Sequence, residues 1–154
     1  MLLAVSSDNS LTYKKIGYAL FDGNSKLVEY GTLIPTKFSD LVNLINKYKA
    51  DLAVELRYLD HRPNSEIERL FTIRTVLETI TLLNKNIVYQ VTPMQWQYWI
   101  RDKFNIKPNG MKIVDAVKLL VDDKSLPKCV LYAIAIGKFV VNNKSKAYYV
   151  IKYE

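Results

Sequence analysis

Hydrophobic positions along the chain fall into short uninterrupted runs and into longer, helically spaced series. Residues 2–5 and 52–54 are consecutive apolar residues, the pattern of strands that are buried on both faces. After the first run, two more strand segments at 16–21 and 26–34 flank a hairpin signal at 22–25, and Pro35 closes the second of them. The opening third of the chain therefore predicts an antiparallel meander of three strands.

The remainder alternates helical and strand patterns. Helical spacing of apolar residues predicts helices over residues 38–47, 64–83, 93–100, 111–121 and 128–141. Buried strands are predicted at 50–55 and 87–91, and a short extra strand at 148–151. This order predicts an α/β fold with a mixed five-stranded sheet, the meander plus two parallel strands, flanked by helices.

Two carboxylates follow strands that the crossover geometry places together. Asp8 follows the first strand, and Glu55 ends the fourth. Right-handed crossovers bring the ends of these strands close, at the edge where α/β sheets bind ligands. Paired carboxylates there outline a site for a hard cation. The alternative, from these two residues alone, is that both acids only make strand ends soluble.

Length and charge narrow the class of protein. With 154 residues, the chain is expected to form one domain over 1–154. A formal net charge of +7 favours an anionic partner, most commonly nucleic acid. A single cysteine, Cys129, and a single histidine, His61, argue against an intramolecular disulfide and a zinc site. No apolar run approaches the ~20 residues of a membrane span, and no secretory signal is visible, so a cytoplasmic location is expected.

Several short motifs occur along the chain, and their combined order is more specific for a protein family than any one of them. They are Asp8–Thr12 followed by Gly17–Ala19, Ala53–Glu55, Arg74, Val91–Pro93 with Trp96, Gly110 with Lys112, and Ala133–Ile136. In this order, over residues 2 to about 140, the chain resembles the RuvC-type Holliday-junction resolvases of the ribonuclease H-like superfamily, particularly small phage or viral members.

The resemblance implies a divalent-metal site. In that family Mg²⁺ or Mn²⁺ is held by an aspartate on the first strand, a glutamate on the fourth and an Asp-x-x-Asp pair on the last helix, for phosphodiester hydrolysis. Carried over by motif, Asp8 and Glu55 are the catalytic and metal-binding residues. Cys129 and Tyr132 stand at the other two positions, and neither a thiol nor a neutral phenol is a natural Mg²⁺ ligand. Asp122 and Asp123, or Asp115, are candidate substitutes.

The first ligand position has a second possible assignment. The opening turn is about two residues longer than is usual in the family, so alignment by strand register, in place of the motif, puts Ser6 there. We prefer Asp8, because the motif matches more residues. His61 is mainly expected to be an exposed loop residue. Basic residues proposed to contact DNA are Lys14, Lys15, Arg57, Arg62, Arg74 and Lys112.

The resemblance implies a protein that binds branched, four-way junction DNA, as a homodimer because a junction has two equivalent scissile strands. If active, it would be an Mg²⁺- or Mn²⁺-dependent endodeoxyribonuclease acting in DNA recombination, in the host cytoplasm if it is viral. Because Cys129 and Tyr132 replace two acids, cleavage is expected to be weak or lost. The alternatives are an inactive structural or recruitment factor with the same fold and a protein-interaction module without a nucleic-acid role.

Overall fold

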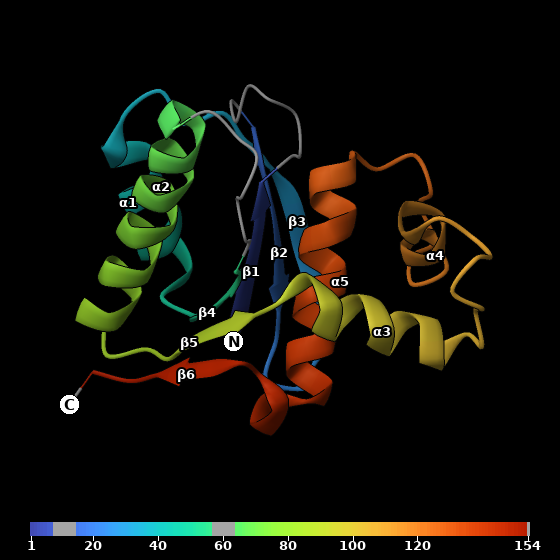
Figure 1. The fold of residues 1–154 in the computed structure, drawn as a ribbon. Helices are drawn as coiled ribbons and strands as arrows, with labels where there is room; N and C mark the ends of the chain where they lie inside the picture. The colour runs from blue at the N-terminus through green and yellow to red at the C-terminus, as the bar shows by residue number, and fades with distance from the viewer. Residues whose placement is uncertain (8–14, 57–63, 154) are drawn as a thin grey trace.

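The computed structural model describes residues 1–7, 15–56 and 64–153, and it forms a central sheet covered by helices on both faces (Figure 1). The strands are β1 (Leu2–Ser7), β2 (Ile16–Phe21), β3 (Leu27–Leu33), β4 (Asp51–Glu55), β5 (Val88–Val91) and β6 (Tyr149–Ile151). The helices are α1 (Phe38–Tyr48), α2 (Asn64–Leu83), α3 (Pro93–Lys103), α4 (Ile113–Lys118), α5 (Lys128–Asn142) and a 3₁₀ turn, η1 (Lys144–Lys146).

The sheet is mixed, in the order β3-β2-β1-β4-β5-β6. The first three strands form the predicted antiparallel meander, and β1, β4 and β5 are parallel. The C-terminal strand predicted around residues 148–151 is confirmed as β6, which pairs antiparallel with β5 and makes the sheet six-stranded. The predicted α/β class and mixed sheet are therefore confirmed.

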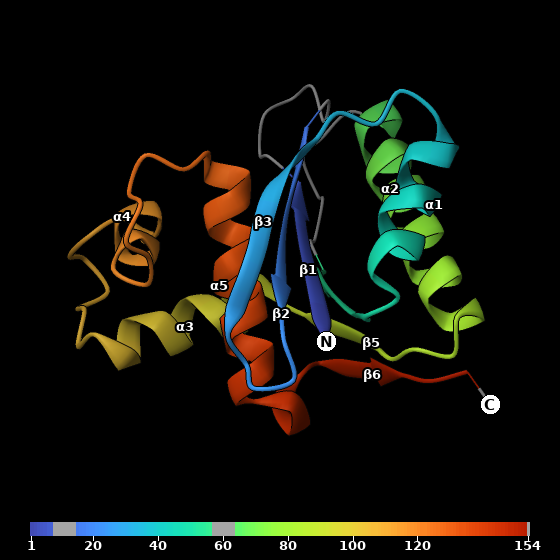
Figure 2. The ribbon, with the colours of Figure 1, turned by 180° about the vertical axis from the view of Figure 1, so that it is seen from behind.

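Helices cover the two faces of the sheet unequally (Figures 1 and 2). Side chains of β1 alternate between the faces, so that Leu2 and Ala4 join a core beneath α5, whereas Leu3 and Val5 join a second core beneath α1 and α2. Helix α5 is buried along most of its length, and α3 and α4 pack around it on the side away from the sheet. This central position of α5 follows from its almost continuous apolar sequence.

Two glycines fix how closely α5 approaches the sheet. A Cβ on Gly17 of β2 would lie 2.3 Å from the backbone carbonyl carbon of Cys129 and 2.5 Å from the backbone nitrogen of Val130. Further along the helix, a Cβ on Gly137 would lie 2.1 Å from Cε2 of Phe21. The amino end of α5 therefore rests on the backbone of β2, beside the ends of the central strands.

Some boundaries differ from those predicted. The helix predicted over 111–121 is only Ile113–Lys118, because the chain tightens into i→i−3 hydrogen bonds, with the amides of Leu119 and Leu120 donating to the carbonyls of Ala116 and Val117. Helix α3 runs on to Lys103, past the predicted end at residue 100. Among the helices described, none is long and apolar enough to span a membrane.

Candidate functional site

The carboxyl ends of β1 and β4 bring Ser6 and Glu55 side by side. The parallel register pairs Ala4 with Ala53 and Val5 with Val54, and one further residue sets Ser6 level with Glu55. Ala4 and Ala53 both pack beneath α5, so strand alternation directs Ser6 and Glu55 to the same face. Ser6 is buried and Glu55 is partly buried. On the β1 side of Glu55, extension of the register thus reaches Ser6, while Val91 pairs with Glu55 on the β5 side and Asp8 lies outside the described residues.

Glu55 is held by a tryptophan from α3. The indole Nε1 of Trp96 donates a hydrogen bond to Oε2 of Glu55 at 2.5 Å. Trp96 is completely buried, and a buried indole N–H requires an acceptor. Helix α3 is itself fixed by a capping box, in which Thr92 Oγ1 accepts from the Gln95 amide and Gln95 Oε1 accepts from the Thr92 amide. The Glu55 carboxylate is therefore engaged from a rigid helix end.

Helix α5 contributes an aromatic ring, that of Tyr132, to the surroundings of Trp96 and Glu55. The ring of Tyr132 packs against Trp96 with centroids 5.2 Å apart, and both Tyr132 and Cys129 are buried. Residues three apart on a helix share a face, so Cys129 lies one turn before Tyr132 on the same side. Nζ of Lys128 lies 5.4 Å from the centroid of the Tyr132 ring. Tyr132 therefore packs on the same tryptophan that bonds Glu55, and the assignment of Cys129 and Tyr132 to ligand positions stays a prediction.

The described side chains do not form a centre for two divalent ions. Ser6, Glu55, Cys129 and Tyr132 offer a single carboxylate, whereas Mg²⁺ and Mn²⁺ prefer several oxygen anions. Within the described ranges, no group of three His, Cys, Asp or Glu residues lies close enough to hold an ion. An ion shared by Asp8 and Glu55 remains a prediction.

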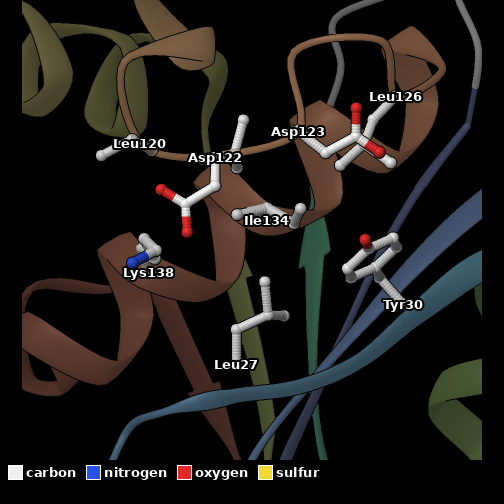
Figure 3. Close-up of a pocket in the computed structure, with 9 residues that line it drawn as sticks. Leu27, Tyr30, Leu120, Asp122, Asp123, Leu126, Ile134 and Lys138 are labelled. Carbon is white, nitrogen blue, oxygen red and sulfur yellow. The ribbon is translucent and has the colours of Figure 1, made fainter.

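The candidate substitute acids lie elsewhere. Asp122 and Asp123 line a hollow between α5 and β3, together with Tyr30 (Figure 3). Strand β3 is at the sheet edge, and two strands separate it from β4 and Glu55. Asp123 accepts hydrogen bonds from the side chain and amide of Ser125, which lower the pKa of its carboxyl group. Asp115 forms an ion pair with Lys118 at 3.7 Å. The structure does not bring these acids to Glu55.

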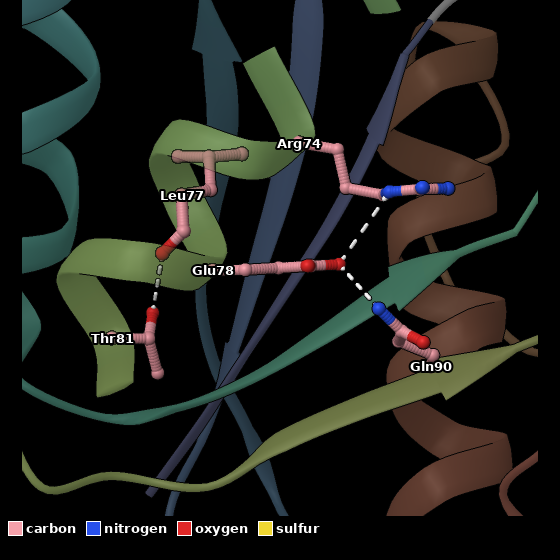
Figure 4. A network of polar contacts seen from close by, with 5 residues as sticks. All are labelled: Arg74, Leu77, Glu78, Thr81 and Gln90. Atoms are coloured by element: carbon pink, nitrogen blue, oxygen red, sulfur yellow. Dashed lines mark hydrogen bonds and ion pairs between the residues drawn. The ribbon is translucent and has the colours of Figure 1, made fainter. Parts of the chain in front are cut away.

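Of the basic residues proposed to contact DNA, Arg74 is engaged within the protein. Its Nε lies 3.5 Å from Oε1 of Glu78, one turn further along α2, and its side chain is 23% exposed. Gln90 of β5 donates to the same Glu78 oxygen at 2.8 Å (Figure 4). Lys15 immediately precedes β2, and Lys112 is exposed at the start of α4. Lys14, Arg57, Arg62 and His61 lie outside the described residues.

Burial has an electrostatic consequence within this cluster. Desolvation raises the pKa of Glu78 above its ordinary value, and the Gln90 hydrogen bond and the Arg74 charge oppose this effect only in part. The carboxylate of Glu78 is therefore a partly buried group whose charged form two polar neighbours partly stabilise.

Solved structures of RuvC share this architecture. The chain is similar to Thermus thermophilus RuvC in complex with a Holliday junction substrate, with a TM-score of 0.67 and 12% identity over 94% of this chain and 96% of that one. It is also similar to a second Thermus thermophilus RuvC structure, with a TM-score of 0.64 and 13% identity over 94% and 95% of the two chains. No protein-family model and no curated protein sequence matches it.

These similarities identify the fold class: the chain has a RuvC-like, ribonuclease H-like fold over nearly its whole length. The predicted fold is thereby confirmed, and the phage or viral type stays a prediction. Trp96 is a core residue, and its hydrogen bond to Glu55 was not predicted from the sequence. A tryptophan N–H buried in an apolar core was a signal that an acceptor lay nearby. Lys128 was also missed, and its position next to Tyr132 had no signal in the sequence.

Proposed function

We propose that this protein binds branched, four-way junction DNA and that metal-dependent cleavage at its strand-end site is weak or lost. Support for binding comes from two independent features. The fold matches that of RuvC, which has been solved on a Holliday junction substrate, and the chain carries a net charge of +7. Phosphate contacts by lysine and arginine supply much of the affinity of such proteins for DNA.

The loss of cleavage is supported by one observation, the packing of Tyr132 on Trp96 beside Glu55. Hydrolysis with two metal ions requires enough negative charge to hold both ions around the attacking and leaving oxygens. Here a ring and a thiol take the places where the resemblance implies two carboxylates. Removing one good transition-state contact lowers a rate by ~10²–10³, and loss of an ion removes at least that much.

Junction binding is tested by titrating a labelled four-way junction and a linear duplex of the same sequence at several salt concentrations. If roughly six phosphates are neutralised, log K should fall against log salt with a slope of about −5, and the junction should bind more tightly than the duplex. An affinity indifferent to salt, or equal for both DNAs, would contradict the proposal and favour the protein-interaction alternative. Incubation of the unmodified chain with junction DNA and Mn²⁺ should give little or no cleavage.

Symmetry adds an expectation about assembly. Because a four-way junction has two equivalent strands, the binding unit proposed is a homodimer. Sedimentation of the protein alone and on junction DNA measures this directly. A monomer bound at one copy per junction would argue for the recruitment-factor alternative, in which symmetric cutting has no role.

A further inference from the structure

A second surface, at the β6 edge of the sheet, combines exposed aromatic rings with lysines. We call it the C-terminal platform: Tyr148, Tyr149, Tyr153, Lys85, Lys146 and Lys152. Tyr148, Tyr149 and Tyr153 are 49%, 55% and 51% exposed, so about half of each side chain is open to solvent. The platform follows the outer edge of the sheet, two strands beyond β4 and away from the amino end of α5 (Figures 1 and 2).

The segment that carries the platform is anchored. Tyr149, Val150 and Ile151 pair with Gln90, Tyr89 and Val88 of β5, and Ile151 packs against the core beneath α1 and α2. Nε2 of Gln95 on α3 donates to the carbonyl oxygen of Lys146 at 2.5 Å. The exposed rings therefore project from a fixed backbone, which reduces the ordering entropy that a ligand must overcome.

The chemistry of the platform is that of rings beside cations. The rings of Tyr148 and Tyr149 pack edge to face with centroids 4.6 Å apart, and Nζ of Lys85 lies 3.5 Å from the centroid of Tyr153. No acidic residue occurs between residues 143 and 153 or in β5. Asp51 of the adjoining β4 accepts a hydrogen bond from the Ile87 amide. Among the described residues, the three platform lysines form no ion pair.

We propose that the C-terminal platform binds a single-stranded nucleic-acid segment, with bases stacking on the tyrosine rings and phosphates contacting the lysines. Stacking requires the open faces of unpaired bases, which a continuous duplex does not offer. A second copy of the chain fits less well. Strand β6 has only three residues, which is short for a strand-to-strand interface, and two such copies would bring lysines of like charge together. The inference does not depend on junction binding.

The test uses a fluorescent dT oligonucleotide of about 12 nucleotides, within the range of single-strand site sizes. Tyr148→Ala and Tyr149→Ala should each weaken binding by about tenfold, because an aromatic ring that stacks on a base is removed. Tyr149→Phe should bind as the unmodified chain does, since it keeps the ring. Tyr98→Ala is the matched control, because Tyr98 is 59% exposed on α3 outside the platform, and its affinity should change less than about twofold.

Charge is tested separately. Three phosphate contacts to a single strand predict a slope of log K against log salt of about −2, and Lys146→Gln with Lys152→Gln should reduce that slope by more than half. Lys107→Gln, at an exposed lysine between α3 and α4, should leave it unchanged. Circular dichroism melting of every variant confirms that each compared protein is folded.

Three results would overturn the inference: no oligonucleotide binding at low salt, equal effects of the platform and control variants, or platform variants that instead abolish self-association. Junction binding by Tyr148→Ala and Tyr149→Ala should stay within about threefold of the unmodified value, because the proposed junction surface lies at the strand ends. Failure of junction binding with retained oligonucleotide binding would refute only the proposed function.

Discussion

At the scale of single residues, a buried side chain donates a hydrogen bond to a glutamate on each face of the sheet. Trp96 places its N–H on Glu55, and Gln90 places its amide on Glu78. In each case a partly buried carboxylate accepts a hydrogen bond from a donor on another element. The two acids differ in their printed partners, because Glu55 accepts from the Trp96 indole whereas Glu78 also faces the Arg74 guanidinium.

Glu78 is expected to make the folded protein less stable as the pH rises through the pKa of its carboxyl group. Its pKa is raised in the folded state above the ordinary value of 4.5, so the folded state favours the protonated form. The stability that this provides is fully present below the unfolded pKa and is lost as pH rises through the folded pKa. Glu78→Gln removes this pH-dependent loss of stability, because a glutamine side chain does not ionise. Its free energy of unfolding, relative to that of the unmodified chain, should therefore increase from about pH 4 to about pH 7.

The measurement is urea unfolding at several pH values. Asp102→Asn, at an exposed carboxylate on α3, serves as the control for removal of a carboxylate. A Glu78→Gln difference that stays constant over this range would show that Arg74 and Gln90 balance the effect of burial on the carboxylate, and a difference that declines would show that they exceed it.

At the scale of elements, the contact between α5 and β2 positions the candidate site. Gly17→Ala would place a Cβ 2.3–2.5 Å from backbone atoms of Cys129 and Val130, which cannot rotate away as a side chain can. The expected loss in free energy of unfolding is about 1–3 kcal/mol, as for other overpacked cores. Gly23→Ala, with no atom within 4 Å of its Cβ, is the matched control and should be nearly neutral. An equal effect of the two changes would contradict the close seating of α5.

The elements themselves were largely predictable because their signals are local. Consecutive apolar residues in β1 and β4 and the Asp22–Ser25 hairpin depend only on neighbouring residues, as does the strand in the C-terminal segment. The early end of α4 was not predictable, because apolar spacing continues beyond Lys118 while the backbone tightens. The bond between Glu55 and Trp96 joins residues 41 apart in sequence, and neither residue alone indicates its partner.

Register explains why the strand-end site was only partly predictable. The sequence motif favours Asp8, whereas the register between β1 and β4, which ends at the pair Val5 and Val54, reaches Ser6 and Glu55 when it is extended by one residue. The alternation of side chains along a strand determines which face of the sheet each side chain takes. The register between two strands determines which residue of one strand lies beside a given residue of the other. The sequence picked out Cys129 and Tyr132 as the residues at the two remaining ligand positions, because the Ala-rich helix motif fixes where those positions fall.

At the scale of the whole molecule, the fold presents two separated surfaces on one basic chain. The strand-end site combines Ser6, Glu55, Cys129 and Tyr132, and the platform occupies the β6 edge. A net charge of +7 favours an anionic partner at both surfaces without distinguishing them. The two proposed activities therefore belong to different surfaces: junction recognition to the strand ends, and base stacking to the platform.

The central claim, junction binding without efficient cleavage, is tested most directly by restoring acids to the site. Cys129→Asp with Tyr132→Asp, and the same pair with Ser6→Asp, are assayed on a synthetic junction with Mg²⁺ and with Mn²⁺. Circular dichroism and junction binding verify folding, and stabilisation by Mn²⁺ reports ion binding apart from activity. The account predicts cleavage at least ~10² above that of the unmodified chain, abolished by adding Glu55→Gln. Efficient cleavage by the unmodified chain, or folded, Mn²⁺-binding variants that gain none, would contradict it.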